Sequence, residues 1–216
     1  MAIGDHLRDV MDLYGSPKCP HTNAVLIAAG EKGVDINSHV EDDWGPSSSI
    51  RSMSPLGIGP VLKDRTAVNI GLVACMSYLD DKGFGPSLVH RNGVTRARMF
   101  QEITIAQQTD CSDDAALAAA LDQLEATLNS PLGNMKGDYC VGQHTLADCA
   151  WAGVCQVATN MGKGTAVSSR SAVNTWFAAV QSHPSTSKEA INPFRCLATK
   201  ADHDGNTMRD VRINTA

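Results

Sequence analysis

The first 82 residues carry two periods of hydrophobic and polar positions, one typical of strands and one typical of helices. Short alternating or continuous apolar runs predict strands, and runs with apolar residues three and four positions apart predict helices. In chain order these are strand 12–14, a helix from about 20 to 30, strand 36–40, a strand entered at 61–62, strand 66–70 and a helix over 71–82. The first part of the chain therefore predicts an α/β unit in the order βαβ followed by ββα.

The rest of the chain has only the helical period. Helices are predicted over 93–109, 113–129, 146–161, 169–181 and, briefly, 185–190. Glycine, proline and polar residues concentrate just before the first of these helices, which is typical of a linker. We therefore expect an α/β N-terminal domain over residues 1–83, a linker over 84–92, an all-helical C-terminal domain over 93–199 and a polar tail over 200–216.

Cys19 lies where the first predicted strand turns into the first predicted helix. Pro20 suits the first helical turn, because the amide hydrogen that it lacks would have no partner there. Free amides and the positive dipole end at a helix start favour a thiolate, so we predict that Cys19 is a nucleophile. Its other interpretation is a small residue that fills a strand–helix junction, and the pattern alone leaves both open. His21 and Asn23 either orient a ligand or form a solvated first turn, and Tyr14 is expected to point into the core.

The composition argues against several classes of function. A net charge of −5 without a cluster of Lys and Arg argues against nucleic acid or an anionic membrane as the main partner. No apolar run approaches the roughly 20 residues of a membrane span, and the N-terminus lacks a secretory pattern. Seven cysteines without a CxxC pair indicate the cytoplasm or another reducing compartment. Cys140, His144 and Cys149 lack a fourth ligand and a common zinc spacing, so no metal site is expected.

A capping box precedes the helix predicted over 146–161. Thr145 and Asp148 have the spacing of such a box. In it, the N-cap side chain accepts a bond from the amide three residues later, and the side chain of that later residue accepts a bond from the N-cap amide. The helix that follows, LADCAWAGVCQVA, is apolar almost all round and should run through the centre of the helical domain. Asp148 is therefore expected to have a structural rather than a catalytic role.

Four stretches resemble, in the right order, the glutathione S-transferase superfamily. They are LYGSPKCPHTNAVLIAAGEKGV, SPLGIGPVLKD, YCVGQHTLADCAWAGV and VNTWFAAVQSHPSTSKEA. The resemblance implies a thioredoxin-like N-terminal domain, an all-helical C-terminal domain, and a homodimer or association with other protein subunits. Cys19 falls where theta-like and phi-like members carry serine and omega-like members carry cysteine followed by proline. The resemblance therefore implies glutathione as the cofactor, and thiol transfer or thiol–disulfide reduction on a small thiol or electrophilic substrate.

The sequence departs from the family where glutathione is usually held. The Glu/Asp–Ser pair that binds the γ-glutamyl end falls on Gly71 and Leu72, whose side chains cannot bond a charged group. Each missing charge-assisted bond forfeits roughly 1.5–3 kcal/mol, so two losses weaken binding on the order of a hundredfold or more. The amide at Leu72 and the backbone of Gly59, beside Pro60 and its candidate cis bond, remain as predicted ligand-binding groups. Thr22 stands where a second cysteine would lie, which fits a monothiol mechanism.

A second function class follows from the same departure. A member of this family that has lost its glutathione clamp can serve as a catalytically silent module that binds or assembles other proteins, and fold alone does not separate the two. The sequence therefore predicts either an enzyme with thiol chemistry at Cys19 or a silent binding module.

Overall fold

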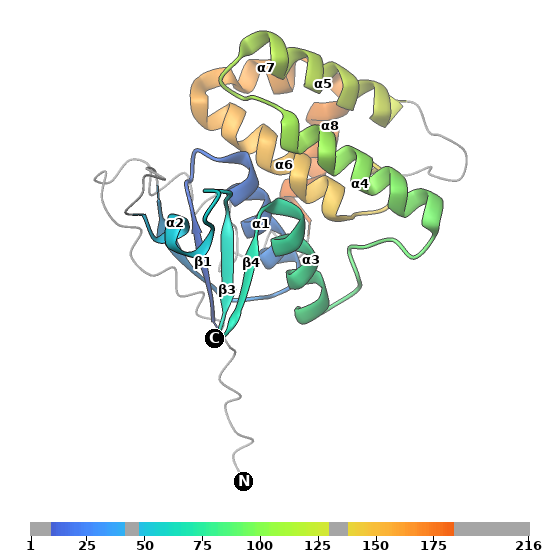
Figure 1. Ribbon diagram of the computed structural model, residues 1–216. Helices are drawn as coiled ribbons and strands as arrows, with labels where there is room; N and C mark the ends of the chain where they lie inside the picture. The colour runs from blue at the N-terminus through green and yellow to red at the C-terminus, as the bar shows by residue number, and fades with distance from the viewer. Residues whose placement is uncertain (1–9, 42–47, 130–137, 184–216) are drawn as a thin grey trace.

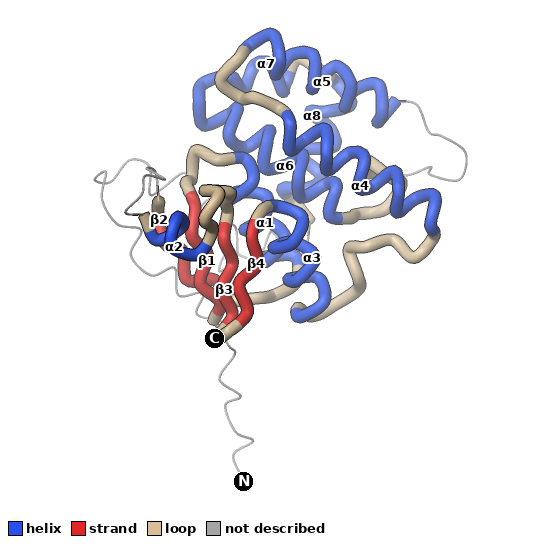
Figure 2. Tube along the Cα trace, in the orientation of Figure 1, coloured by secondary structure: helices blue, strands red, loops and turns tan. Residues whose placement is uncertain are grey.

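A computed structural model describes residues 10–41, 48–129 and 138–183 of the chain (Figure 1). The predicted short helix at 185–190 and the predicted tail at 200–216 lie outside the described residues. Figure 2 shows the strands at one end of the molecule and the helices of the second half at the other. Within the described ranges, every helix is too short or too polar to cross a membrane.

The N-terminal part is built on a four-stranded mixed sheet in the order β2–β1–β3–β4. The strands are β1 (Met11–Gly15), β2 (Ile36–Val40), β3 (Val61–Asp64) and β4 (Ala67–Ile70). β1 runs parallel to β2 and antiparallel to β3, and β4 runs antiparallel to β3. A parallel pair needs a crossover connection, which helix α1 (Pro20–Glu31) supplies.

Two further helices complete this part, a short α2 (Ser49–Met53) and α3 (Leu72–Lys82). The inward positions of β1 are buried and the outward positions are partly exposed, as the alternation predicts. The order βαβ–ββα and the mixed sheet confirm the predicted thioredoxin-like fold.

All the described elements after residue 92 are helices, which confirms the predicted all-helical second part. They are α4 (Gly93–Gln108), α5 (Asp114–Asn129), α6 (Leu146–Ala158), α7 (Gly164–Ser168) and α8 (Ser171–Gln181). The helix predicted over 146–161 is shorter than expected, because a π-helical turn (Thr159–Lys163) follows Ala158 and Gly162 has a φ of 78°. The apolar run that buries α6 ends at Ala158, and the exposed residues beyond it turn the chain into α7.

Helix α6 is the centre of the helical part, and all of its residues are buried. Its capping box is present: the Asp148 carboxylate accepts bonds from the Thr145 amide (2.8 Å), the Cys140 amide (3.0 Å) and the Trp176 indole Nε1–H (2.8 Å). The predicted structural role of Asp148 thus agrees with its contacts. Helix α6 packs closely against α1 at Gly153, where a Cβ atom would lie 2.4 Å from the Pro20 carbonyl oxygen.

A buried carboxylate also joins α4 to α6. Oε2 of Glu102, which has no exposed surface, accepts a bond from the Trp151 indole Nε1–H at 3.2 Å, and Oε1 lies 3.4 Å from the Arg98 guanidinium. Burial raises the pKa of Glu102, against the lowering effect of Trp151 and Arg98. The ionised form of this side chain is therefore disfavoured in the folded protein.

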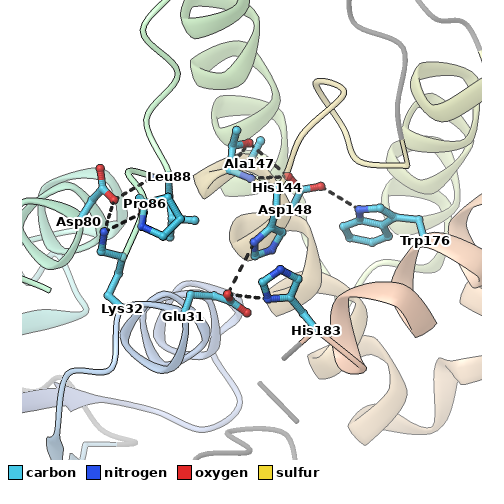
Figure 3. A network of polar contacts seen from close by, with 11 residues as sticks. Glu31, Lys32, Asp80, Pro86, Leu88, His144, Ala147, Asp148, Trp176 and His183 are labelled. Atoms are coloured by element: carbon cyan, nitrogen blue, oxygen red, sulfur yellow. Dashed lines mark hydrogen bonds and ion pairs between the residues drawn. The ribbon is translucent and has the colours of Figure 1, made fainter. Parts of the chain in front are cut away.

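A buried ion pair holds the chain that leads from the first part to the second. Lys32 Nζ lies 3.0 Å from Asp80 Oδ1 and donates to the Pro86 carbonyl (Figure 3). Burial alone would raise the pKa of Asp80, but bonds from the Leu88 amide, the Ser87 hydroxyl and Lys32 outweigh it and lower that pKa. The segment 86–88 is therefore tied to α1 and α3.

Candidate active site at the start of helix α1

Cys19 is the N-cap residue of α1, with extended backbone angles and no side-chain capping bond. Pro20 occupies the first helical position, as predicted, and the Asn23 amide bonds the Cys19 carbonyl at 3.2 Å. The first amides of a helix have no carbonyl partner within it, which here are those of His21 and Thr22. A thiolate at Cys19 would lie next to these donors and the positive end of the helix dipole.

The loop that carries Cys19 is fixed by Asn23. The Asn23 side chain is fully buried, and its amide nitrogen donates to the carbonyls of Pro17 (2.8 Å) and Cys19 (2.9 Å). Asn23 therefore does not belong to a solvated first turn, and its contacts hold the backbone of Cys19 in place. A direct bond from Asn23 to a ligand stays a prediction.

His21 connects the start of α1 to the end of α4. Its Nε2 lies 3.0 Å from the Gln107 carbonyl oxygen and donates to it. Burial lowers the pKa of His21, against the raising effect of this bond, so the imidazole is neutral at pH 7. The predicted role of His21 in ligand binding remains untested by these contacts.

The peptide bond between Gly59 and Pro60 is cis, as its place at the strand entry suggested. Tyr14 pairs with Val61 across β1 and β3, so Pro60 lies beside the end of β1, where the loop to Cys19 begins. The Pro60 carbonyl accepts the Gly71 amide at 2.8 Å. The fold thus brings the predicted residues Gly59, Pro60 and Gly71 to the end of the sheet from which the loop to Cys19 leaves.

Gly71 and Leu72 occupy the start of α3. Gly71 is its N-cap, with a φ of 84°, and a Cβ atom there would lie 3.5 Å from the side chain of Ile58. Leu72 is 2% exposed and packs in the core. Ile58, by contrast, is 47% exposed. At the two positions where the resemblance predicts polar anchors for glutathione, this chain therefore has a glycine and a core leucine.

Cys19 differs in exposure from every other described cysteine. The structure describes six free cysteines; Cys19 is partly exposed and the rest are buried, namely Cys75, Cys111, Cys140, Cys149 and Cys155. Burial raises the pKa of Cys75 to about 12 and that of Cys111 to about 11, where Asp110 and Cys19 add to the effect. At neutral pH these two thiols stay protonated, so neither is a nucleophile.

Tyr14 lies on the opposite face of the sheet from Leu13, and the prediction that it belongs to the core is wrong. It is partly exposed and stacks on His39, with ring centroids 4.4 Å apart. His39 Nε2 lies 2.8 Å from Asp12 Oδ1. Burial, with Asp12 and Glu41, raises the pKa of Tyr14, so its hydroxyl stays protonated near neutral pH. Four of the five residues of the neighbouring edge strand β2 are likewise only partly buried.

A second group of titratable side chains lies at the other end of α1. His183 Nδ1 is 2.9 Å and His144 Nδ1 3.7 Å from Glu31 Oε2 (Figure 3). No local sequence pattern predicts this group, because its members come from α1, the loop before α6 and the end of α8. The candidate zinc ligands of the sequence, Cys140, His144 and Cys149, share only His144 with this group.

Comparison with known proteins finds relatives over part of the chain. No protein-family model matches it. A stringent starvation protein A homologue from Coxiella burnetii is 33% identical over 91 residues, 42% of this chain and 44% of the relative, so the match spans less than half of that protein. A second protein of the same description, from Pasteurella multocida, is 26% identical over 159 residues, 69% of this chain and 75% of that relative.

Solved structures resemble most of the chain. A maleylacetoacetate isomerase from Methylobacterium extorquens AM1, with bound malonate and GSH, has a TM-score of 0.71 at 18% identity and covers 85% of this chain and 97% of its own. A delta-class glutathione transferase from Nilaparvata lugens has a TM-score of 0.68 at 23% identity, and the match covers 87% of this chain and 99% of the transferase chain. At these identities the likeness shows a shared fold.

Proposed function

We propose that this chain, which shares its fold with glutathione transferases, is a thiol-transferring enzyme with Cys19 as its nucleophile. One observation carries this proposal: Cys19 is the N-cap of α1 and is partly exposed, whereas the other described cysteines are buried. Reactive cysteines combine a helix N-terminus with access to solvent.

The reaction that fits a single thiol is disulfide exchange in two steps. The Cys19 thiolate attacks the glutathione sulfur of a mixed disulfide, forms a Cys19–glutathione disulfide, and releases the substrate thiolate, which takes up a proton. A second glutathione thiolate then attacks this disulfide, releases oxidised glutathione, and regenerates the Cys19 thiolate. Cys111, the nearby thiol with a pKa of about 11, remains protonated and does not resolve the intermediate.

Glutathione binds weakly in this proposal. The side chains at Gly71 and Leu72 cannot hold its γ-glutamyl end, so the backbone at Gly59 and the amides at the starts of α1 and α3 carry the contact. The loss of two charge-assisted bonds lowers affinity on the order of a hundredfold or more relative to a site that has them. Bound GSH in the Methylobacterium isomerase supports a glutathione site in this fold.

The test measures turnover of a glutathione mixed disulfide by the purified full-length protein. Cys19→Ser should abolish turnover, because a hydroxyl does not exchange with disulfides, and Cys111→Ala should retain it as the matched control. Alkylation of the wild type at pH 7 should modify Cys19 faster than free cysteine.

Wild-type protein that neither turns over the disulfide nor alkylates faster than free cysteine would overturn the proposal and favour a silent binding module. Calorimetry with glutathione separates weak binding from none. Three expectations stay predictions: the homodimer, the association with other subunits and the reducing compartment. Light scattering of the purified protein tests the homodimer.

A further inference from the structure

A cluster of three metal-ligating side chains joins the two parts of the molecule away from Cys19. Glu31 is the last residue of α1, His144 lies in the loop before α6, and His183 follows the end of α8 (Figure 3). One ligand atom from each lies within 4.8 Å of the other two. Since α1 has 12 residues, this cluster is about 18 Å along the helix axis from Cys19, which precedes the first of them.

His144 provides the second observation. Its side chain is only 8% exposed, and among the described residues neither ring nitrogen has a hydrogen-bond partner. A buried polar group without a partner costs about 1–3 kcal/mol, so native structures nearly always satisfy such groups with protein, water or an ion. The Nδ1 atom faces the Glu31 carboxylate at 3.7 Å, which is longer than a hydrogen bond.

We infer that Glu31, His144 and His183 bind one divalent transition-metal ion of the Zn²⁺ class. Two imidazoles and one carboxylate are an established donor set for Zn²⁺, with bonds of about 2.0–2.2 Å. In tetrahedral geometry such bonds place neighbouring ligand atoms about 3.3–3.5 Å apart. The two distances to Glu31 Oε2, 2.9 and 3.7 Å, lie on either side of this value.

The rings reach the ion by small rotations. The His144 and His183 rings are stacked, with centroids 4.5 Å apart and planes 28° apart, so their lone pairs must turn toward one point. The His183 side chain is 29% exposed, and a water molecule would supply the fourth ligand of the ion. The bound ion would tie α1 to the loop before α6 and to the end of α8.

The experiment uses the full-length protein, stripped of metal by a chelator and with Cys19 alkylated so that its thiol cannot bind metal. Titration with Zn²⁺ against a chromogenic chelator should give one ion per chain. Loss of an outer-shell partner alone costs about 10–100-fold in metal affinity, so His183→Gln and Glu31→Gln should each weaken binding by about 100-fold or more. His39→Gln, which removes a half-exposed histidine outside the cluster, should bind Zn²⁺ as the wild type does.

Cobalt supplies the readout that identifies the ligands. The Co²⁺ complex should show visible bands of a four- or five-coordinate site without a thiolate charge-transfer band, and Zn²⁺ should raise the Tm of the wild type but not of His183→Gln. Absence of stoichiometric binding, a thiolate band, or unchanged affinity in His183→Gln would each overturn the assignment. A third variant, His144→Gln, removes the buried ligand and can fail to fold. In that case the affinity of His183→Gln decides the assignment, because the His183 side chain is partly exposed.

Discussion

Gly153 lets α6 approach α1, and Gly153→Ala tests whether this contact positions the start of α1. A Cβ atom there would lie 2.4 Å from the Pro20 carbonyl oxygen and 2.8 Å from the Ala24 amide nitrogen, both backbone atoms that no side-chain rotation can move. Ordinary contact begins at 3.4 Å, so the two helices must move apart by about 1 Å along the shorter of these two directions.

The change in unfolding free energy caused by Gly153→Ala is a balance of two contributions. Overpacking a dense core costs typically about 1–3 kcal/mol, whereas alanine in a helix interior is more favourable than glycine by about 1 kcal/mol. Both helices are almost wholly buried where they meet, since Ala24, Val25 and Ala28 are at most 1% exposed. The cost should therefore lie near its upper end, and Gly153→Ala should lose about 1–2 kcal/mol of unfolding free energy.

Urea unfolding measures the loss, and Gly93→Ala is the matched control. Gly93 begins α4 and a Cβ there meets nothing within 4 Å, so this variant should be as stable as the wild type or gain about 0.5 kcal/mol. Because Pro20 follows Cys19, Gly153→Ala should also change the alkylation rate of Cys19. Equal stability of Gly153→Ala and Gly93→Ala, with unchanged alkylation of Cys19, would refute the reasoning.

Three further predictions concern buried polar groups. Thr145→Ala should lower the unfolding free energy by about 1–2 kcal/mol, because the helix loses its cap. Asp148→Ala should lower it by about 3 kcal/mol or more, because several buried donors lose their acceptor. Urea unfolding of the two variants measures both losses. The pKa of Asp80 is lower in the folded protein than its unfolded value of 3.8. The ionised carboxylate therefore stabilises the fold fully above pH 3.8, and this contribution is lost as the pH falls through the folded pKa. Asp80→Asn, which also weakens the Lys32 pair, should therefore be less stable than the wild type at pH 7 but differ less from it at pH 2. The pKa of Glu102 is raised, so wild-type stability should fall as pH rises from 4.5 through the folded value, and Glu102→Gln should gain on the wild type over that range in thermal scans.

Local patterns were enough to predict most of the fold. The alternation of β1, the helical period of α1 and the hairpin between β3 and β4 each arise within a few residues, and the structure has all three. The capping box at Thr145 and the cis bond before Pro60 are likewise local. Cys19 could be placed at a helix start because Pro20 marks the first turn by its missing amide hydrogen.

Features set by packing were not visible in the sequence. Tyr14 alternates as predicted, but whether its face is covered depends on what packs over the sheet, and His39 from the neighbouring strand shares that face. Asn23 carries no sequence sign that its side chain bonds the loop at Pro17 rather than solvent. The end of α6 at Ala158 depends on where the rest of the helical part stops covering it.

Helix α1 connects the two proposed sites, which can be tested separately because each depends on a different end of it. Cys19 needs the free amides of the first turn, whereas the cluster at Glu31 needs His144 and His183 from the helical part. The rigid helix between them keeps the two sites about 18 Å apart, beyond the Debye length of about 8 Å at physiological salt. His183→Gln should therefore leave the alkylation rate of Cys19 unchanged, and Cys19→Ser should leave Zn²⁺ affinity unchanged. A variant at one end that altered both would show that α1 shifts as a body against α6, which Gly153→Ala should then reproduce.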